Sequence, residues 1–541
     1  MKKSLLSIEN LSVIFNHRQI VVDDISFEIF PGETFALVGE SGSGKSITAL
    51  SVLRLLPNNA QLTATAINLQ GDNLLARSER ELCRIRGKRI GLIFQDPMSS
   101  LNPVMTIAAQ IVEVLNIHFD YSAEKNQQRV LELLQQVELP EPQRRMTEYP
   151  HQLSGGQRQR VMIAIALAGE PELLIADEPT TSLDVTIQAQ ILALLKNIQR
   201  QNNMALWLIS HDLTLVSSIA DRIAVMQQGK LVECGINPGL FENPQHAYTR
   251  QLLAVLPRLE HCANRQAQEH SLLLSVQDFK VYYPIRKGIF KRIVDYVKAV
   301  DGVSFSLQQG KTLALVGESG CGKTTLGKGL LNLITGASGE VRLDGIALHQ
   351  LQGDDLRKQR AAMQIVFQDP FSSMNPRMLV GDIIAEGLQA LHPEVDAAER
   401  QERVRQLISA VGLPEASISR YPHEFSGGQR QRICIARALA VEPKLIVCDE
   451  PTSALDVSVQ AQIIQLLKKI QQERGVSYLF ITHDFGVVAE IADDVAVMYQ
   501  GKIVEVGSVA QVLQQPSHAY TQKLLSAVPK LAAVRQFATL L

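Results

Sequence analysis

The sequence has few cysteines, and they are scattered. Its 541 residues include only six, with no Cys-X-X-Cys pair and no spacing typical of a zinc site. Isolated cysteines of this kind are typical of buried thiols in a reducing compartment. Their positions are Cys83, Cys234, Cys262, Cys321, Cys434 and Cys448.

Long apolar runs are also missing. No stretch approaches the roughly 18 uninterrupted apolar residues that span a bilayer, and residues 161–169 are short enough to be buried core. The opening Met1-Lys2-Lys3 precedes an apolar run that Glu9 interrupts, which predicts a first strand rather than a signal peptide. We therefore expect a cytosolic protein, or one bound peripherally to the cytoplasmic face of the inner membrane.

Neither sign of charge is in excess. The formal net charge is −2 and the isoelectric point is about 6.7, which gives no sequence-wide electrostatic footprint for nucleic acid. We therefore expect no nucleic-acid partner. Hydrophobic residues make up 46% and charged residues 20%, as in globular proteins, and 541 residues are too many for one core.

A repeat divides the chain into two halves. A set of short motifs occurs twice in the same order, and the distances between motifs are nearly kept. Ser154 precedes Asp177 by 23 residues, and Ser426 precedes Asp449 by the same 23. The segment between the halves is polar and aperiodic. We expect a first domain over 1–256, a linker over 257–270 and a second domain over 271–541.

The apolar pattern predicts an α/β fold in each half. Short apolar runs at 173–177 and 205–210 fit buried parallel strands. Residues 96–152 and 369–424 are typical of helices, which indicates a helical subdomain inserted in the α/β core. Further strands are expected at 5–15, 25–30 and 34–38, with a helix after Lys45.

Each half contains a phosphate-binding loop signature, G-X-X-X-X-G-K-[ST], after an apolar strand. Glycines let successive N–H groups point at phosphate oxygens, and the next helix adds its positive end. Lys45 and Lys323 would reach the phosphates, while Ser46 and Thr324 would ligate Mg²⁺. The expected ATP-binding residues are Gly39, Ser41, Gly42, Gly44, Lys45 and Ser46, and Gly317, Ser319, Gly320, Gly322, Lys323 and Thr324.

A pair of carboxylates ends an apolar run in each half. Asp177 and Asp449 are placed to hold Mg²⁺, and Glu178 and Glu450 to orient or deprotonate the attacking water. Taken alone, such a pair is as compatible with ordinary strand-end charge. Its position after the P-loop and before a histidine favours the catalytic interpretation.

A glutamine and a histidine complete the predicted catalytic set. Gln95 and Gln368, each within Phe-Gln-Asp-Pro, fit a group that senses both Mg²⁺ and the water. His211 and His483 each follow an apolar strand, where a histidine is usually a satisfied core residue. Both lie 33 residues after the catalytic glutamate, and this repeated spacing favours contact with the γ-phosphate.

A Ser-Gly-Gly-Gln motif in each half reads as a helix start. Serine is a good N-cap, and the glycines expose backbone N–H groups. These residues alone do not distinguish a ligand site from an ordinary capped helix. The residues are Ser154, Gly155, Gly156 and Gln157, and Ser426, Gly427, Gly428 and Gln429.

Together these motifs resemble an ATP-binding cassette (ABC) ATPase over nearly the whole chain. The resemblance implies a P-loop RecA-like core with an antiparallel β subdomain and a helical signature subdomain in each half. It also implies that the signature of one half closes on the ATP held by the other, in an internal pseudo-dimer. Phe15 and Tyr283 match the aromatic that stacks on adenine, although a packed strand aromatic explains them equally well.

Residues 95–103 and 368–376, and a His-Ala-Tyr-Thr segment near each tail, resemble the peptide and nickel importer ATPases. The fusion and residues 284–295 resemble the fused ATPases of peptide and microcin C importers. The partners implied are two integral-membrane permease subunits and an extracytoplasmic binding protein, with one chain per transporter. Many unfused relatives bind an iron–sulfur cluster through clustered cysteines, but only Cys262 lies in that region, so no cluster is expected.

Several alternatives stay open at the level of sequence. A ribosome-acting twin-cassette factor is disfavoured by the short linker and neutral charge, and a DNA-repair cassette by the absence of zinc-spaced cysteines. The basic segment 284–292 predicts a solvated loop, with a membrane-surface or partner contact as the alternative. Cys321, inside the second P-loop near Lys323, is expected to have a lowered thiol pKa and to react with maleimide unless ATP protects it.

Overall fold

The computed structural model describes residues 3–181, 183–254, 256, 271–287, 292–453 and 455–528. The described residues form two compact units, one within 3–254 and the other within 256–528. The predicted linker 257–270, with Cys262, lies outside the described residues, and the predicted domain boundaries stay a prediction. Among the helices of the described residues, none is long and apolar enough to cross a membrane.

The central sheet of unit 1 has six strands in the order β11-β10-β3-β9-β8-β7. All neighbours pair in parallel except β10 and β11. Every residue of β3 and β9 is buried, which is why these strands are continuous apolar runs. The strands are β3 (Thr34–Val38), β7 (Ile90–Ile93), β8 (Leu173–Asp177), β9 (Ala205–Ser210), β10 (Arg222–Gln227) and β11 (Lys230–Ile236).

A second, antiparallel sheet packs on this core. β1 (Leu6–Phe15) pairs with β2 (Gln19–Ile29), β4 (Ala60–Thr63) and β5 (Ala66–Leu69), and β5 with β6 (Asp72–Asn73). Alternate residues are buried in the last part of β2, from Ile25 to Ile29, as expected where one face of a sheet meets a core and the other meets water. The apolar face shares one hydrophobic cluster with the central sheet, including the buried Trp207 of β9.

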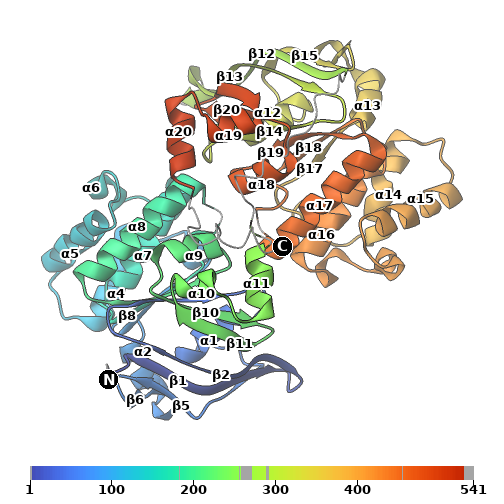
Figure 1. Ribbon diagram of the computed structural model, residues 1–541. Helices are drawn as coiled ribbons and strands as arrows, with labels where there is room; N and C mark the ends of the chain where they lie inside the picture. The colour runs from blue at the N-terminus through green and yellow to red at the C-terminus, as the bar shows by residue number, and fades with distance from the viewer. Residues whose placement is uncertain are drawn as a thin grey trace. The chain divides into compact units, whose positions relative to one another are not determined.

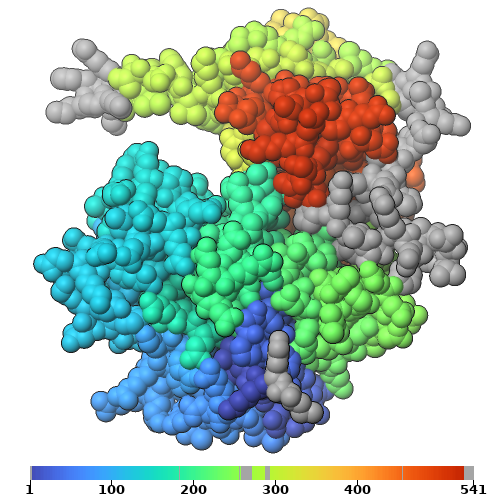
Figure 2. Space-filling model, turned by 60° about the vertical axis from the view of Figure 1, so that its left-hand side comes forward, coloured from blue at the N-terminus to red at the C-terminus, as the bar shows by residue number. Residues whose placement is uncertain are grey.

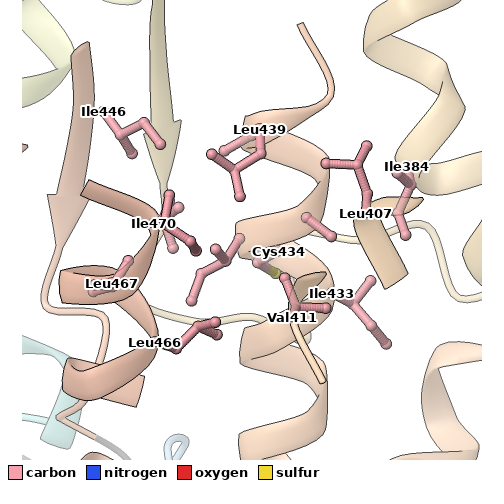
Figure 3. Close-up of a cluster of buried hydrophobic side chains, with 14 of the residues drawn as sticks. Ile384, Leu407, Val411, Ile433, Cys434, Leu439, Ile446, Leu466, Leu467 and Ile470 are labelled. Atoms are coloured by element: carbon pink, nitrogen blue, oxygen red, sulfur yellow. The ribbon is translucent and has the colours of Figure 1, made fainter. Parts of the chain in front are cut away.

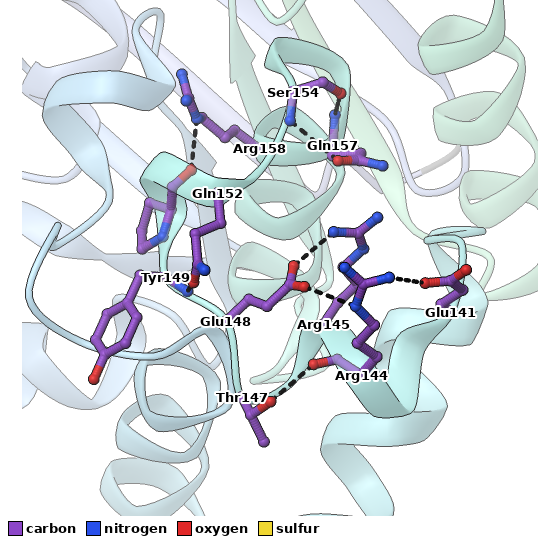
Figure 4. Close-up of polar contacts among 11 residues, drawn as sticks. Glu141, Arg144, Arg145, Thr147, Glu148, Tyr149, Gln152, Ser154, Gln157 and Arg158 are labelled. Atoms are coloured by element: carbon purple, nitrogen blue, oxygen red, sulfur yellow. Dashed lines mark hydrogen bonds and ion pairs between the residues drawn. The ribbon is translucent and has the colours of Figure 1, made fainter. Parts of the chain in front are cut away.

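The helices of unit 1 include a helical subdomain between β7 and β8, where α4, α5 and α7 pack on one another (Figure 1). The ionic contacts of Glu148 with Arg144 and Arg145 brace the chain as it enters α7 (Figure 4). The helices are α1 (Lys45–Val52), η1 (Leu74–Ala76), α2 (Glu79–Ile85), α3 (Pro97–Ser100), α4 (Ile107–His118), α5 (Ala123–Gln136), α6 (Pro142–Arg145), η2 (Pro150–Gln152), α7 (Gly155–Leu167), α8 (Val185–Gln201), α9 (Leu213–Ile219), α10 (Gly239–Glu242) and α11 (Ala247–Ala254).

Unit 2 repeats this plan. Its central sheet has the order β17-β18-β19-β14-β20-β21, and its antiparallel sheet the order β13-β12-β15-β16. The strands are β12 (Leu272–Lys287), β13 (Arg292–Gln308), β14 (Thr312–Val316), β15 (Ala337–Leu343), β16 (Ile346–Ala347), β17 (Met363–Val366), β18 (Leu445–Asp449), β19 (Ser477–Ile481), β20 (Asp494–Tyr499) and β21 (Lys502–Ser508).

One hydrophobic cluster joins the helical subdomain of unit 2 to its central sheet. Ile433 and Cys434 face Ile384 and Leu407 on one side and Leu467 on the other (Figure 3). The helices are α12 (Lys323–Leu330), η3 (Leu348–Gln350), α13 (Gly353–Ala362), α14 (Val380–Leu391), α15 (Ala397–Ala410), η4 (Glu415–Ser419), η5 (Pro422–Glu424), α16 (Gly427–Leu439), α17 (Val457–Arg474), α18 (Phe485–Ile491), α19 (Val509–Gln514) and α20 (Ala519–Ser526).

The expected solvated loop at 284–292 is wrong for its described residues. β12 runs to Lys287 and β13 resumes at Arg292, so this part of the chain is a long antiparallel hairpin, visible in Figure 2 as the yellow-green arm of unit 2. Tyr283 pairs with Val297 and Pro284 with Tyr296. Aromatic and β-branched residues on both strands favour this extended pairing over a loop.

Candidate functional site

In each unit the predicted site residues meet at one edge of the central sheet. In unit 1 the P-loop follows β3, Asp177 ends β8, His211 follows β9 and Gln95 lies just beyond β7. These four strands are neighbours and run parallel, so their carboxyl ends share an edge. Open parallel sheets bind ligands at this edge.

The first and last glycines of each P-loop signature occupy positions where a Cβ would clash with neighbouring atoms. Gly44 has a φ of 103° and Gly322 one of 109°, in the left-handed region. A Cβ at Gly39 would lie 2.1 Å from the carbonyl oxygen of Met226. Gly317 has the same constraint, at 2.2 Å from the Met498 carbonyl oxygen. The backbone therefore curls as a phosphate-binding loop requires, with Ser41 and Ser319 exposed on it.

The P-loop lysines lie across their own loops. Lys45 Nζ donates to the carbonyl oxygens of Gly39 and Glu40, each at 2.8 Å. Lys323 Nζ donates to those of Gly317 and Glu318, at 2.7 and 2.9 Å. Each ammonium group is thus held over the concave face of its loop.

The predicted Mg²⁺ ligands also come together. Ser46 Oγ donates to Asp177 Oδ1 at 3.0 Å, and Thr324 Oγ1 to Asp449 Oδ1 at 2.8 Å. Burial raises the pKa of Asp177 to about 6 and also raises the pKa of Asp449. A buried carboxylate beside a hydroxyl is a set of oxygen donors that suits Mg²⁺, whose charge would offset the cost of burial. These residues therefore fit the ion.

Glu178 is the centre of a hydrogen-bond cluster. Its carboxylate accepts from Gln95 Nε2 at 2.8 Å and Thr181 Oγ1 at 2.9 Å, and lies 3.0 Å from His211 Nδ1. Burial opposes its ionisation, but the hydrogen bond and charge of His211 outweigh burial and hold the pKa of Glu178 at about 2. The same pairing raises the pKa of His211 against the effect of burial.

Unit 2 repeats the cluster with two differences. Gln368 Nε2 donates to Glu450 Oε2 at 3.0 Å, but His483 Nδ1 lies 3.5 Å from that oxygen. Ser453, in the place of Thr181, donates to the backbone oxygen of Glu450 rather than to its carboxylate. Glu178 and Glu450 share a φ of 46°, a left-handed conformation that is strained for a residue with a Cβ and is often found at functional sites.

The predicted N-caps at the two signatures are confirmed. Ser154 accepts from Gln157 N at 3.4 Å, and the Gln157 side chain accepts from Ser154 N at 3.1 Å (Figure 4). Ser426 and Gln429 form the same capping box over α16. Because the serines and the first glycines are exposed, the helix N-termini are open to a ligand. Within a unit, these residues belong to the helical subdomain and not to the cluster around Glu178 or Glu450.

The two candidate adenine-stacking aromatics differ in exposure. Phe15 is half-buried and packs on the hydrophobic core, as the strand-aromatic alternative expects. Tyr283 is 40% exposed on β12. Phe15 is the last residue of β1, whereas β12 continues past Tyr283 to Lys287.

The pKa shift predicted for Cys321 is wrong, and three residues that hydrogen-bond to the site were not predicted. Burial raises the pKa of Cys321, so the expected lowering by Lys323 is not found. Thr181 was missed, although its fixed distance of three residues from Glu178 was available as a signal. Also missed were Tyr248 and Tyr520, whose hydroxyls accept from P-loop backbone N–H groups more than 200 residues away in sequence.

Comparison with known families agrees with this site. The sequence model described as ABC transporter matches residues 22–181 and 300–453. That described as the C-terminal region of oligopeptide/dipeptide transporters matches 232–278 and 504–540. The chain belongs to the ABC transporter family, with two cassettes and the C-terminal region present twice. As such a cassette protein it binds ATP and is an ATPase.

Three individual relatives show which kind of ABC transporter protein the chain resembles. The chain is 49% identical over 98% of its length, and 97% of the relative, to the peptidoglycan transport ATP-binding protein YejF of Agrobacterium fabrum (strain C58). It is 49% identical to YejF of Escherichia coli (strain K12), an uncharacterized ABC transporter ATP-binding protein, over 97% of this chain and 100% of that one. It is 44% identical to the glutathione import ATP-binding protein GsiA of Pectobacterium atrosepticum, over 98% of this chain and 90% of that one.

These relatives are ATP-binding proteins of transporters, as the main interpretation of the sequence expected, and they do not support the ribosome-acting alternative. The chain is an importer-type ABC ATPase.

Proposed function

We propose that the chain powers the import of peptides or peptide-like compounds, with both of its ATP sites hydrolytic. The observation that carries this proposal is the double occurrence of the oligopeptide/dipeptide transporter C-terminal region beside two complete catalytic clusters. The relatives named for glutathione import and peptidoglycan transport support a peptide-like substrate. A compound like microcin C belongs to the same chemical class.

The geometry of the chain supports a role for each of these residues. Loop N–H groups and Lys45 bind the phosphates, and Mg²⁺ held by Ser46 and Asp177 would neutralise phosphate charge. Glu178 stays ionised and accepts a hydrogen bond from the attacking water, whose proton it can take. Gln95 orients this carboxylate from one side and His211 from the other. Lys323, Thr324, Asp449, Glu450, Gln368 and His483 act in the same roles in unit 2.

Each site needs the signature of the other half. Ser426, Gly427 and Gly428 would complete the ATP site of unit 1, and Ser154, Gly155 and Gly156 that of unit 2. This is supported by the open, capped N-termini of α7 and α16, which present unfilled backbone N–H groups for an anion. One chain would then supply both sites, and closure upon ATP binding followed by reopening after hydrolysis would drive transport.

The proposed partners are two integral-membrane permease subunits, with an extracytoplasmic binding protein that delivers substrate. The chain would lie on the cytoplasmic face of the inner membrane. The helical subdomains beyond Gln95 and Gln368 are the proposed permease contacts. Phe94, Met98 and Phe371 next to them are exposed apolar side chains, which supports a binding surface there.

Co-purification tests this function. The tagged chain is purified in detergent from the cells that naturally make it, and the recovered complex is placed in lipid nanodiscs. We expect one chain to retain two permease subunits, and a binding protein loaded with peptide to stimulate ATP hydrolysis several-fold over the empty binding protein. Recovery without permeases, or with ribosomes, would overturn the proposal.

A further inference from the structure

The tail of each unit, which is α11 in unit 1 and α20 in unit 2, contacts the P-loop of the same unit. Tyr248 of α11 accepts a hydrogen bond at its hydroxyl from the backbone N–H of Glu40 at 3.3 Å. Tyr520 of α20 accepts one from the N–H of Glu318 at 3.1 Å. Both tyrosines are buried, with 5% and 8% of their surface exposed. They belong to the repeated His-Ala-Tyr segment, for which the catalytic roles above give no reason.

The peptide group that each tyrosine contacts is the one that holds the P-loop lysine. The Gly39–Glu40 peptide receives Lys45 Nζ on its carbonyl oxygen at 2.8 Å and donates its N–H to Tyr248. In unit 2 the Gly317–Glu318 peptide receives Lys323 at 2.7 Å and donates to Tyr520. One planar peptide group thus contacts both the tail tyrosine and the lysine. Because the group is planar, a tyrosine that fixes its N–H also fixes the direction of its carbonyl oxygen.

A short series of hydrogen bonds anchors the tail to β11. Glu233 on β11 accepts from the backbone N–H groups of Gln245 at 2.8 Å and His246 at 3.2 Å. His246 Nδ1 accepts in turn from Tyr248 N at 3.2 Å. These contacts fix where α11 begins and therefore where the tyrosine ring is placed.

Unit 2 has the same series of hydrogen bonds, but its tyrosine ring has a different neighbour. Glu505 accepts from Ser517 N at 2.7 Å and His518 N at 3.2 Å, and His518 Nδ1 accepts from Tyr520 N at 3.1 Å. In both units 15 residues separate the glutamate from the tyrosine. The ring of Tyr499 packs on that of Tyr520, whereas unit 1 has Gln227 at the corresponding place on β10. The hydroxyl contact with the loop is kept while the ring's neighbour changes.

We propose that Tyr248 and Tyr520 are positioning residues that hold the P-loop in its phosphate-binding conformation. The hydroxyl fixes the first peptide group of the loop, and the carbonyl oxygen of this peptide group holds the lysine across the loop. A loop that is already ordered loses less conformational freedom when ATP binds. The inference rests on the proposed P-loop assignment and gives the tail a role in nucleotide binding.

The test uses the full chain with Tyr248→Phe, Tyr520→Phe and both changes together, which remove only the hydroxyls. Tyr499→Phe is the matched control, since its ring packs on Tyr520 at 4.1 Å but its hydroxyl accepts from Gln500 Nε2. Affinity for a fluorescent, non-hydrolysable ATP analogue, KM, kcat and the melting temperature are measured.

We expect the double variant to weaken analogue binding and raise KM by about 2- to 10-fold, the usual effect of one neutral hydrogen bond. The kcat and melting temperature should stay close to wild type, and Tyr499→Phe should change none of these values. Unchanged affinity and KM in the double variant would overturn the inference. So would a lowered melting temperature with unchanged KM, because that is a packing role.

Lys45→Ala with Lys323→Ala separates this inference from the assignment on which it rests. If the lysine changes abolish analogue binding and the tyrosine changes do nothing, only the tyrosine inference is wrong. If the lysine changes leave binding intact, the P-loop assignment itself is wrong.

Discussion

Gln95 donates from Nε2 to Glu178 Oε2 over 2.8 Å, and Gln368 makes the same contact with Glu450 over 3.0 Å. Each glutamine is exposed at the start of the helical subdomain, whereas each glutamate lies half-buried against the central sheet. A movement of that subdomain therefore changes the orientation of the proposed catalytic carboxylate. This contact would connect the proposed permease-binding surface to hydrolysis.

Glu178→Gln and Glu450→Gln should each remove at least about half of the ATPase activity, because each deletes one carboxylate base while keeping the side-chain shape. The double variant should lose about 10²- to 10⁴-fold, the usual contribution of general base catalysis. Steady-state phosphate release at saturating Mg·ATP measures this. Glu172→Gln, at a partly exposed ion pair with Arg89, is the control and should change the ATPase activity little. A single variant with wild-type activity would show that its site does not hydrolyse ATP under those conditions.

Gly428→Ala should destabilise unit 2, while Gly427→Ala should not. A Cβ at Gly428 would lie 2.3 Å from Val459 Cγ1, whereas one at Gly427 would lie 3.6 Å from Leu455. The stiff β-branched Val459 cannot rotate away, so we expect a cost of about 1–3 kcal/mol. Thermal unfolding of both variants checks this, and adding Val459→Ala should recover part of the loss. Equal melting temperatures for the two alanine variants would contradict the packing of α16 on α17.

Cys321 should react slowly with maleimide at pH 7. The thiolate is the nucleophile, and burial raises the pKa of Cys321, so less thiolate is present near neutrality than at an exposed thiol. Below that pKa, each added pH unit should speed its labelling about tenfold. Mass spectrometry of labelled peptides at pH 7, 8 and 9 follows this, with the exposed Cys83 as the reference. Labelling of Cys321 as fast as Cys83 at pH 7 would restore the activated-thiol hypothesis.

A fragment of residues 1–256 should fold by itself if the predicted boundary is correct. Trp207 is the only tryptophan and is fully buried beside Phe27, so its fluorescence reports the core of unit 1. We expect blue-shifted emission and one cooperative unfolding transition for the fragment. Red-shifted emission in buffer would mean that unit 1 needs the rest of the chain.

The sequence predicted the bounds of strands most accurately where a strand is buried on both faces of the sheet. The runs at 34–38, 173–177 and 205–210 are strands with those same bounds, because such strands need continuous apolar residues. The meeting of Lys45, Asp177 and His211 at one edge follows from parallel strands that share a direction. The serine N-caps were predictable because a helix start depends on a few consecutive residues, whereas the reciprocal bonds of Gln157 and Gln429 were not predicted.

Other features depend on contacts that no local pattern records. The hairpin around Pro284 was missed because basic residues and a glycine suggested a loop, while cross-strand pairs such as Tyr283 with Val297 decide the structure. The lowered pKa expected for Cys321 neglected burial, which the sequence does not give. Tyr248 contacts Glu40 across 208 residues, so its position in the tail could not predict that partner.

A disulfide across the proposed composite site tests the central claim most directly. Ser41→Cys in the first P-loop and Ser426→Cys in the second signature are both at exposed positions, and would be combined in a chain with Cys83, Cys234 and Cys262 replaced by serine. With ATP and the hydrolysis-blocking Glu178→Gln and Glu450→Gln changes, mild oxidation should give an intramolecular disulfide, seen as a faster-migrating monomer on a non-reducing gel. Disulfides only between chains, or none with ATP, would contradict a site completed within one chain.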